Sequence, residues 1–194
     1  MSEDRFSARK TAIDGVLIFD PKPIRDDRGH FVRVFDNEFF SEHHLPNVRW
    51  VQENQSRSAK GTLRGLHFRS DLSEAKLVRC TLGAVFEAVV DLRPESSTYL
   101  ATLWLNLDDV DHRLILVPPG CAHGFQALTE RADILYKHSS VYKPSAECAV
   151  RYDDQKFDIP WPLANPILSE RDQNAPSFIE IEPNLRGWFS GQSK

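Results

Sequence analysis

The sequence predicts an all-β protein, built as a small barrel or jelly roll closed by irregular arms. Between Lys76 and Tyr136, short apolar runs alternate with turn signals, which is the pattern of antiparallel strands. After Tyr142 the chain becomes rich in proline, which has no amide donor, so this tail cannot supply central strands and is expected to wrap the barrel. Helix is scarce: the best candidate, residues 37–44, is short enough to be a loop instead.

Three strand pairs are expected in the central region. Each consists of two apolar runs separated by a turn, and they are residues 76–81 with 84–92, 100–107 with 113–118, and 125–128 with 134–137. Gly83 is expected to make the first turn, and aspartates in residues 108–111 suit the second. Along 84–92, side chains alternate between two faces, so Val85, Glu87 and Val89 share one of them.

Length and composition predict one globular domain, residues 1–194, with a core at about 13–176, because 194 residues lie within the range of a single core. With 41% hydrophobic and 27% charged residues, the chain is neither membrane-spanning nor disordered in composition. Residues 1–10 lack the apolar centre of a secretory signal, so we expect a cytoplasmic protein. The three cysteines are widely spaced and form no zinc or redox motif, and a net charge of −4 disfavours nucleic acid as a partner.

Two motifs carry histidines that could exchange protons near neutral pH. The run RGLHFR, residues 64–69, contains His67, and PPGCAHGF, residues 118–125, delivers His123 at the start of a strand. Taken alone, His67 is more often a structural or surface residue, and His123 could simply satisfy a local hydrogen bond. Two such histidines on one barrel favour a catalytic or binding site over two unrelated structural residues.

Two further residues could complete acid–base chemistry. Tyr136 lies in an apolar strand, and its phenol could donate a proton to a carbanionic carbon, although it could also be an ordinary strand tyrosine. Asp172, in LSERDQNAP, could be a solvated turn or cap residue. Bound to an imidazole, its carboxylate would instead fix the tautomer and raise the basicity of the ring.

Together these motifs resemble the dTDP-4-dehydrorhamnose 3,5-epimerase family from residue 13 to residue 176. The pieces that carry the resemblance occur in family order and are DDRGHF, VQENQSRS, RGLHF, AKLVRCTLGAVFEAVVDLR, PPGCAHGF, LYK and LSERD. The resemblance implies a cupin-like jelly-roll β-barrel with irregular N- and C-terminal arms and short helices. It also implies a homodimer with an exchanged N-terminal strand.

The resemblance implies roles for individual residues. His67 would be the general base with Asp172 as its partner, Tyr136 the proton donor on the opposite face of the sugar, and Lys76 the group that stabilises the enolate. The residues that would bind the nucleoside-diphosphate sugar are Arg28, Arg33, Gln52, Asn54, Arg64, His123, Glu147 and Arg171. No metal and no cofactor is implied.

Three arginines depart from the family pattern. Arg33 stands where a glutamate near the nucleotide is usual, Arg69 replaces a glutamine, and Arg171 replaces a lysine. Recognition of the base or phosphates can therefore differ. Relatives that invert one carbon, or that use a CDP- or GDP-linked sugar, share the same catalytic residues, so these residues indicate epimerisation but do not specify thymidine as the base.

Three other functions fit parts of the sequence. A metal-dependent cupin would need several histidines around its ion, but Arg69 stands where a paired histidine would be, and its charge would repel a cation. A non-catalytic sugar-nucleotide binder would not need acid and base together. A ketoisomerase would use similar residues, and product analysis would separate it from an epimerase.

Overall fold

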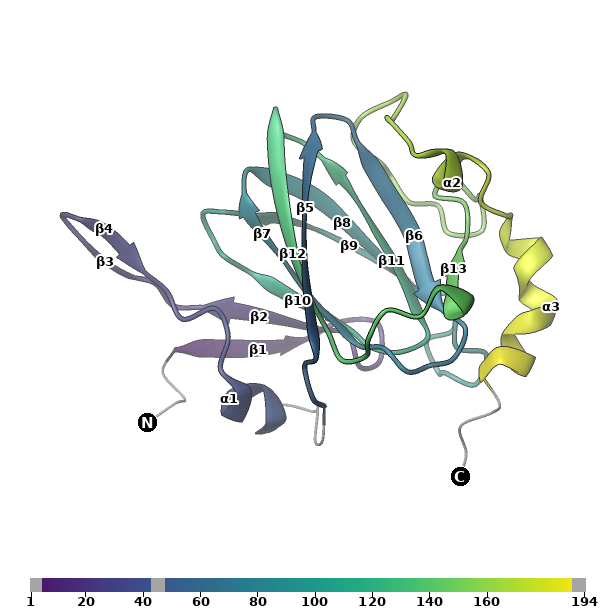
Figure 1. Ribbon diagram of the computed structural model, residues 1–194, viewed down its shortest axis with the longest axis horizontal. Coiled ribbons are helices and arrows are strands. Elements are labelled where there is room, and N and C mark those ends of the chain that lie inside the picture. Colours follow the sequence, from purple (N-terminus) through teal and green to yellow (C-terminus); the bar gives the residue numbers. More distant parts are fainter. Residues whose placement is uncertain (1–4, 43–47, 190–194) are drawn as a thin grey trace.

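Two antiparallel sheets face each other in the computed structural model, which describes residues 5–42 and 48–189 (Figure 1). The first has the order β1-β2-β10-β7-β12-β5. Its strands are β1 (Phe6–Lys10), β2 (Leu17–Pro21), β10 (Leu114–Val117), β7 (Lys76–Leu82), β12 (Arg131–His138) and β5 (Gln52–Ala59). This pair of sheets confirms the predicted all-β jelly roll.

The second sheet has the order β13-β6-β11-β8-β9. Its strands are β13 (Glu147–Ala149), β6 (Leu63–Arg69), β11 (Cys121–Ala127), β8 (Ala84–Asp91) and β9 (Thr102–Asp108). Between the sheets, aliphatic side chains of β7, β10 and β12 pack against Val85, Val89 and Phe125. The predicted alternation along β8 is therefore confirmed, since Val85 and Val89 point inward while Val90 packs on the opposite face.

The outer faces of both sheets are covered. Phe39 and Phe40 of α1 (Asn37–Glu42) pack on the first sheet beside Phe19. The C-terminal tail, with η1 (Pro144–Ala146), α2 (Glu170–Gln173) and α3 (Phe178–Phe189), covers the second sheet (Figure 1). This wrapping confirms the predicted role of the tail. The helix predicted at 37–44 exists as α1, and residues 43 and 44 of the predicted segment lie outside the described residues.

A two-stranded hairpin, β3 (Ile24–Asp26) with β4 (Gly29–Phe31), projects from the body (Figure 1). It exposes two large apolar side chains, Ile24 at 48% and Phe31 at 66%.

Within residues 5–42 and 48–189, no helix is long and apolar enough to cross a bilayer.

The three predicted hairpin pairings are wrong, although the strands themselves exist. Strands β7, β10 and β12 lie in the first sheet, whereas β8, β9 and β11 lie in the second, so each expected turn instead carries the chain across the sandwich. At Gly83, where φ is 73°, a Cβ atom would overlap Arg131 O and Thr129 Oγ1. Alternation along a strand shows which side chains face the core, but two strands can share that core from opposite sheets.

The tail also contains a helix that the sequence analysis missed. Helix α3 has 12 residues and includes Pro183, which made the segment read as irregular. Its buried residues are Phe178, Ile181 and Leu185, a spacing of three and four that is typical of a helix face. Strands β1, β2, β5 and β6 were missed as well. In β5 most side chains are polar, so no apolar alternation marked it.

Candidate active site

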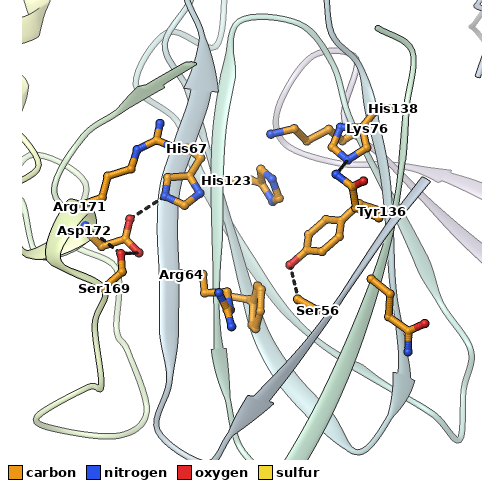
Figure 2. A pocket seen from close by; sticks show the side chains of 13 residues that line it. Ser56, Arg64, His67, Lys76, His123, Tyr136, His138, Ser169, Arg171 and Asp172 are labelled. Atoms are coloured by element: carbon orange, nitrogen blue, oxygen red, sulfur yellow. Dashed lines mark hydrogen bonds and ion pairs between the residues drawn. The ribbon is translucent and has the colours of Figure 1, made fainter. Parts of the chain in front are cut away.

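A cavity of about 390 Å³ opens between the two sheets, a size that suits a small-molecule ligand. Figure 2 shows side chains from β5, β6, β7, β11, β12 and the α2 region directed into it. The lining residues are Asn54, Gln55, Ser56, Arg64, His67, Lys76, His123, Phe125, Tyr136, His138, Ser169, Arg171 and Asp172. Most of them carry titratable or hydrogen-bonding groups.

Strands β6 and β11 place His67 and His123 directly opposite each other. Opposite residues of an antiparallel pair point to the same side, so both imidazoles enter the cavity. Close to this pair, the backbones of Gly65 and Gly124 meet with almost no room between them. A Cβ atom on Gly65, whose φ is 133°, would lie 2.5 Å from Gly124 Cα.

The Gly65→Ala variant is expected to lose about 1–3 kcal/mol of unfolding free energy from backbone strain alone, because its φ is one that only glycine adopts readily. Chemical denaturation monitored by fluorescence measures this loss. The matched control is Gly187→Ala in α3, where nothing lies within 4 Å of the new methyl group. Since alanine favours helix, that change should stabilise the protein by up to about 1 kcal/mol. Equal stability of the two variants would contradict the packing argument.

His67 and Asp172 form a hydrogen-bonded pair, with 2.6 Å between Nε2 and Oδ1. The short helix α2 fixes the carboxylate, since Ser169 caps the helix and its hydroxyl donates to Asp172 Oδ2 at 2.9 Å. Burial raises the pKa of Asp172, but its bonds from His67 and Ser169 outweigh this, and the pKa is lowered overall. An ionised Asp172 accepts from Nε2–H and leaves Nδ1 of His67 with a lone pair.

A second imidazole–carboxyl pair lies deeper, with 2.7 Å between His123 Nδ1 and Glu87 Oε1. Complete burial raises the pKa of Glu87 well above its ordinary value and lowers the pKa of His123 well below its own, with the positive charge of Lys76 adding to the second effect. Both shifts favour an uncharged pair. Among the described residues, Glu87 Oε2 has no hydrogen-bond partner.

Tyr136 lies across the cavity from His67 (Figure 2). Its hydroxyl is 3.1 Å from Ser56 Oγ, and its ring is 6.3 Å from that of His123. Burial raises the pKa of Tyr136, an effect that the hydrogen bond with Ser56 only partly offsets. The phenol therefore keeps its proton over the whole physiological pH range.

Three cationic side chains complete the lining, Lys76 from β7, Arg64 from β6 and Arg171 from α2 (Figure 2). Arg64 is anchored by its Nε, which donates to Ser58 Oγ at 3.1 Å. The cavity thus combines an imidazole–carboxylate pair, a phenol on the far side and three positively charged side chains in its wall. Such a set can remove a proton from carbon, stabilise the resulting anion and return a proton to the other face.

The sequence model of the dTDP-4-dehydrorhamnose 3,5-epimerase family matches residues 10–180. The chain belongs to this family. It is therefore an isomerase of the epimerase type, as its motifs predicted.

Relatives of known name agree with this membership. The dTDP-4-dehydrorhamnose 3,5-epimerase of Salmonella typhimurium is 43% identical, over 86% of this chain and 92% of its own length. The dTDP-4-dehydrorhamnose 3-epimerase of Streptomyces niveus is 39% identical, over 86% and 81%. The solved dTDP-6-deoxy-D-glucose-3,5-epimerase of Legionella pneumophila, in complex with dTDP-4-keto-L-rhamnose, has a TM-score of 0.88 and 36% identity, covering 93% and 96%. The predicted cupin-like jelly roll of this family is confirmed.

The structure brings most of the predicted site residues of this epimerase into the cavity. They are the four predicted catalytic residues His67, Tyr136, Asp172 and Lys76 and the four predicted substrate-binding residues Asn54, Arg64, His123 and Arg171. Gln52 does not line the cavity itself but contacts a residue that does, because its Nε2 donates to Asn54 Oδ1 at 3.2 Å. Glu147 is half-buried on β13, opposite Arg69 of β6.

Two predicted substrate-binding arginines lie away from the cavity within this chain. Arg28 is at the tip of the β3–β4 hairpin, 90% exposed, and pairs with Asp26. Arg33 follows the hairpin and pairs with Asp36. Their roles in binding stay predictions that depend on where the hairpin lies in an assembled enzyme.

Several residues of the site were missed by the sequence analysis. Four of them line the cavity, namely Ser56, Phe125, His138 and Ser169. A fifth, Glu87, forms a hydrogen bond with His123 deeper in the protein. Strand periodicity held a signal for two of them. His138 is two residues after Tyr136 on the same face, and Glu87 is a charged residue on the inward face of an apolar strand. Among the described residues, no three His, Cys, Asp or Glu side chains group as ligands for a metal ion.

Proposed function

We propose that the protein inverts a carbon or carbons beside the ketone of a dTDP-linked 4-keto-6-deoxyhexose. The observation that carries the proposal is the position of His67 and Tyr136 on opposite sides of one cavity that Lys76 also lines (Figure 2). An epimerase needs this arrangement because the proton leaves one face of the carbon and returns to the other. The Legionella relative, solved with dTDP-4-keto-L-rhamnose, supports the sugar and the nucleotide.

In the proposed reaction, Nδ1 of His67 takes the proton from the carbon beside the ketone, and the electrons of the broken C–H bond move into an enolate. Asp172 stabilises the imidazolium that forms, through the 2.6 Å bond to Nε2. The ammonium of Lys76 stabilises the negative charge on the enolate oxygen. Tyr136 then donates its hydroxyl proton to the opposite face, and exchange with solvent restores both groups.

Arg64 and Arg171 are the side chains of the cavity best suited to bind the diphosphate, because one guanidinium group can form two hydrogen bonds to a phosphate in bidentate fashion. Incubation with dTDP-, CDP- and GDP-linked 4-keto-6-deoxyhexoses, followed by NMR of the products, tests the substrate. Inversion of the dTDP sugar is expected to be the most efficient. A strong preference for CDP or GDP would correct the nucleotide, and a moved keto group would identify a ketoisomerase.

Inversion at one carbon only is the second candidate. It is favoured by the 39% identity to the Streptomyces niveus 3-epimerase, which is close to the identity with the 3,5-epimerases. The same NMR experiment separates the two, because a 3-epimerase leaves the configuration at C5 unchanged. Metal analysis of the purified protein tests the accompanying prediction that the reaction needs no metal and no cofactor.

We also propose a homodimer in which the β3–β4 hairpin reaches the partner subunit. The support is the exposure of Ile24 and Phe31 on a hairpin that projects from the body, since apolar side chains in such a position favour pairing. This placement would bring Arg28 close to the cavity of the partner subunit. Sedimentation analysis of the full chain tests the dimer, and a monomer at assay concentrations would contradict it.

The Tyr136→Phe variant is expected to lose net inversion while retaining proton removal at His67, because it lacks only the donor for the opposite face. Solvent deuterium should therefore enter the substrate faster than product accumulates. Mass spectrometry of the recovered sugar nucleotide, together with NMR of its configuration, measures both rates. A variant as active as the parent would remove Tyr136 from the mechanism.

A further inference from the structure

Three polar side chains form a row across adjacent strands at one side of the cavity. Gln52 of β5 lies opposite His138 of β12, and His138 lies opposite Lys76 of β7. Because directly opposite residues of an antiparallel sheet share a face, all three point toward the interior. Neither His138 nor its neighbour Glu74 has a role in the reaction proposed above.

Hydrogen bonds join this row, and one backbone group fixes their direction. Tyr142 N–H can only donate, so its 2.9 Å partner on Gln52 is the acceptor oxygen Oε1. The amide nitrogen of Gln52 then donates to Asn54 Oδ1 at 3.2 Å, which leaves Asn54 Nδ2 to donate to His138 Nε2 at 3.3 Å. An Nε2 that accepts carries no proton, so the proton of a neutral His138 is on Nδ1.

The chain ends on Glu74, whose Oε1 is 2.9 Å from His138 Nδ1. Burial raises the pKa of Glu74, but the bond from His138 and the charges of Lys76 and Arg69 lower it overall, so the group is a carboxylate that accepts. Its other oxygen, Oε2, lies 3.4 Å from Lys76 Nζ. Arg69 is farther away at 3.7 Å and forms two bonds with Asp71.

We propose that Glu74 and His138 are positioning residues that hold the Lys76 ammonium at the cavity and tie it to the substrate-binding amides of Asn54 and Gln52. This inference rests on the proposed function, because Lys76 needs a ketone oxygen to act on. His138 has both ring nitrogens bonded, to Glu74 and to Asn54, so it offers no lone pair to a substrate. It acts through Glu74, not as a third base.

Charge explains why Lys76 needs such a partner. The titratable and charged groups around Lys76 and Glu74 are His138, Tyr136, Arg69 and His123 with Glu87 behind it, and His67 with Asp172 lines the other side of the same cavity. Burial favours the uncharged forms of Glu87 and His123, so neither balances an ammonium. Glu74 is the buried carboxylate in ion-pair contact with Lys76, with its side chain 5% exposed.

The tautomer of His138 in the free protein tests the hydrogen-bond chain without any substrate. Long-range ¹H–¹⁵N NMR of the ¹⁵N-labelled full chain, assigned with a His138→Asn variant, reports which ring nitrogen carries the proton. The hydrogen bonds require a proton on Nδ1 and none on Nε2. An Nε2–H form would overturn the proposed chain, whatever reaction the protein catalyses.

Kinetics of Glu74→Gln test the effect on Lys76. This change removes the charge and keeps the shape, and we expect kcat to fall roughly 10- to 100-fold, since a displacement of about 1 Å can cost this much. KM should stay within about twofold, because the interaction forms mainly in the transition state.

Two variants of His138 separate its two bonds. In His138→Asn the side-chain amide can still donate to Glu74, so kcat should be largely retained, whereas His138→Phe loses both bonds and should lose kcat as well. The control is Glu130→Gln, the same change at a side chain that is 89% exposed, which should behave as the parent. Glu74→Gln with the parent kcat would overturn the proposal. A parent that inverts no sugar would refute the proposed function instead, and the tautomer measurement would still decide the hydrogen-bond chain.

Discussion

The His67→Asn variant is expected to lose proton exchange at every carbon beside the ketone, while its affinity for the nucleotide stays nearly that of the parent. A positioned general base contributes roughly 10²- to 10⁴-fold, and this imidazole has the geometry for it, with Asp172 bound to Nε2. The base lowers the barrier and does not bind the diphosphate, so kcat should fall and Kd should not change. Deuterium incorporation measured by mass spectrometry and titration calorimetry with dTDP provide the two readings.

Retained nucleotide binding is also the control for folding in this experiment. If exchange at one carbon survived the loss of His67, that carbon would be deprotonated by another group of the cavity, and His123 would be the first to test. If nucleotide binding disappeared together with exchange, a catalytic role would not be separated from a structural one, and the assignment of His67 would fail.

The Lys76→Met variant is expected to lower kcat by roughly 10²- to 10³-fold, the usual cost of removing one donor to a developing oxyanion. Methionine keeps the unbranched shape of the side chain, so the cavity should keep its form. The effect should appear in kcat and in kcat/KM alike, because the enolate exists only after proton removal. Steady-state kinetics with the preferred sugar nucleotide give both values.

The control for this variant is Lys60→Met, the same change at a side chain that is 51% exposed and lies in a weak surface ion pair. It should have the activity of the parent. A Lys76→Met variant with an unchanged kcat would show that the enolate oxygen is stabilised elsewhere, for example by Arg64.

The fold class and the strands between Lys76 and Tyr136 were predictable from the sequence, but the strands before them and the pairing of all strands were not. The apolar alternation of residues 84–92 located β8 and separated its two faces correctly. The same alternation could not show that β7 and β8 lie in opposite sheets, because a turn at Gly83 serves a hairpin and a crossing equally well. Helix α3 was hidden by Pro183, although its buried face repeats with helical spacing.

The sequence motifs predicted the catalytic residues of the site, but not the side chains that form hydrogen bonds with them. His67, Tyr136, Lys76 and Asp172 come from four separate segments, and the structure brings all of them to one cavity. Their partners depend on register. His138 forms a hydrogen bond with Glu74 because β12 pairs with β7 in a register that places His138 opposite Lys76. No local sequence pattern specifies this register.

Proton exchange by the unaltered protein in heavy water tests the central claim most directly, namely that one carbon is deprotonated on one face by His67 and reprotonated on the other by Tyr136. With a dTDP-4-keto-6-deoxyhexose, we expect each inverted carbon to carry deuterium, and substrate recovered early to carry less deuterium at that carbon than product. Inverted product without deuterium, or no exchange at all beside the ketone, would contradict this mechanism.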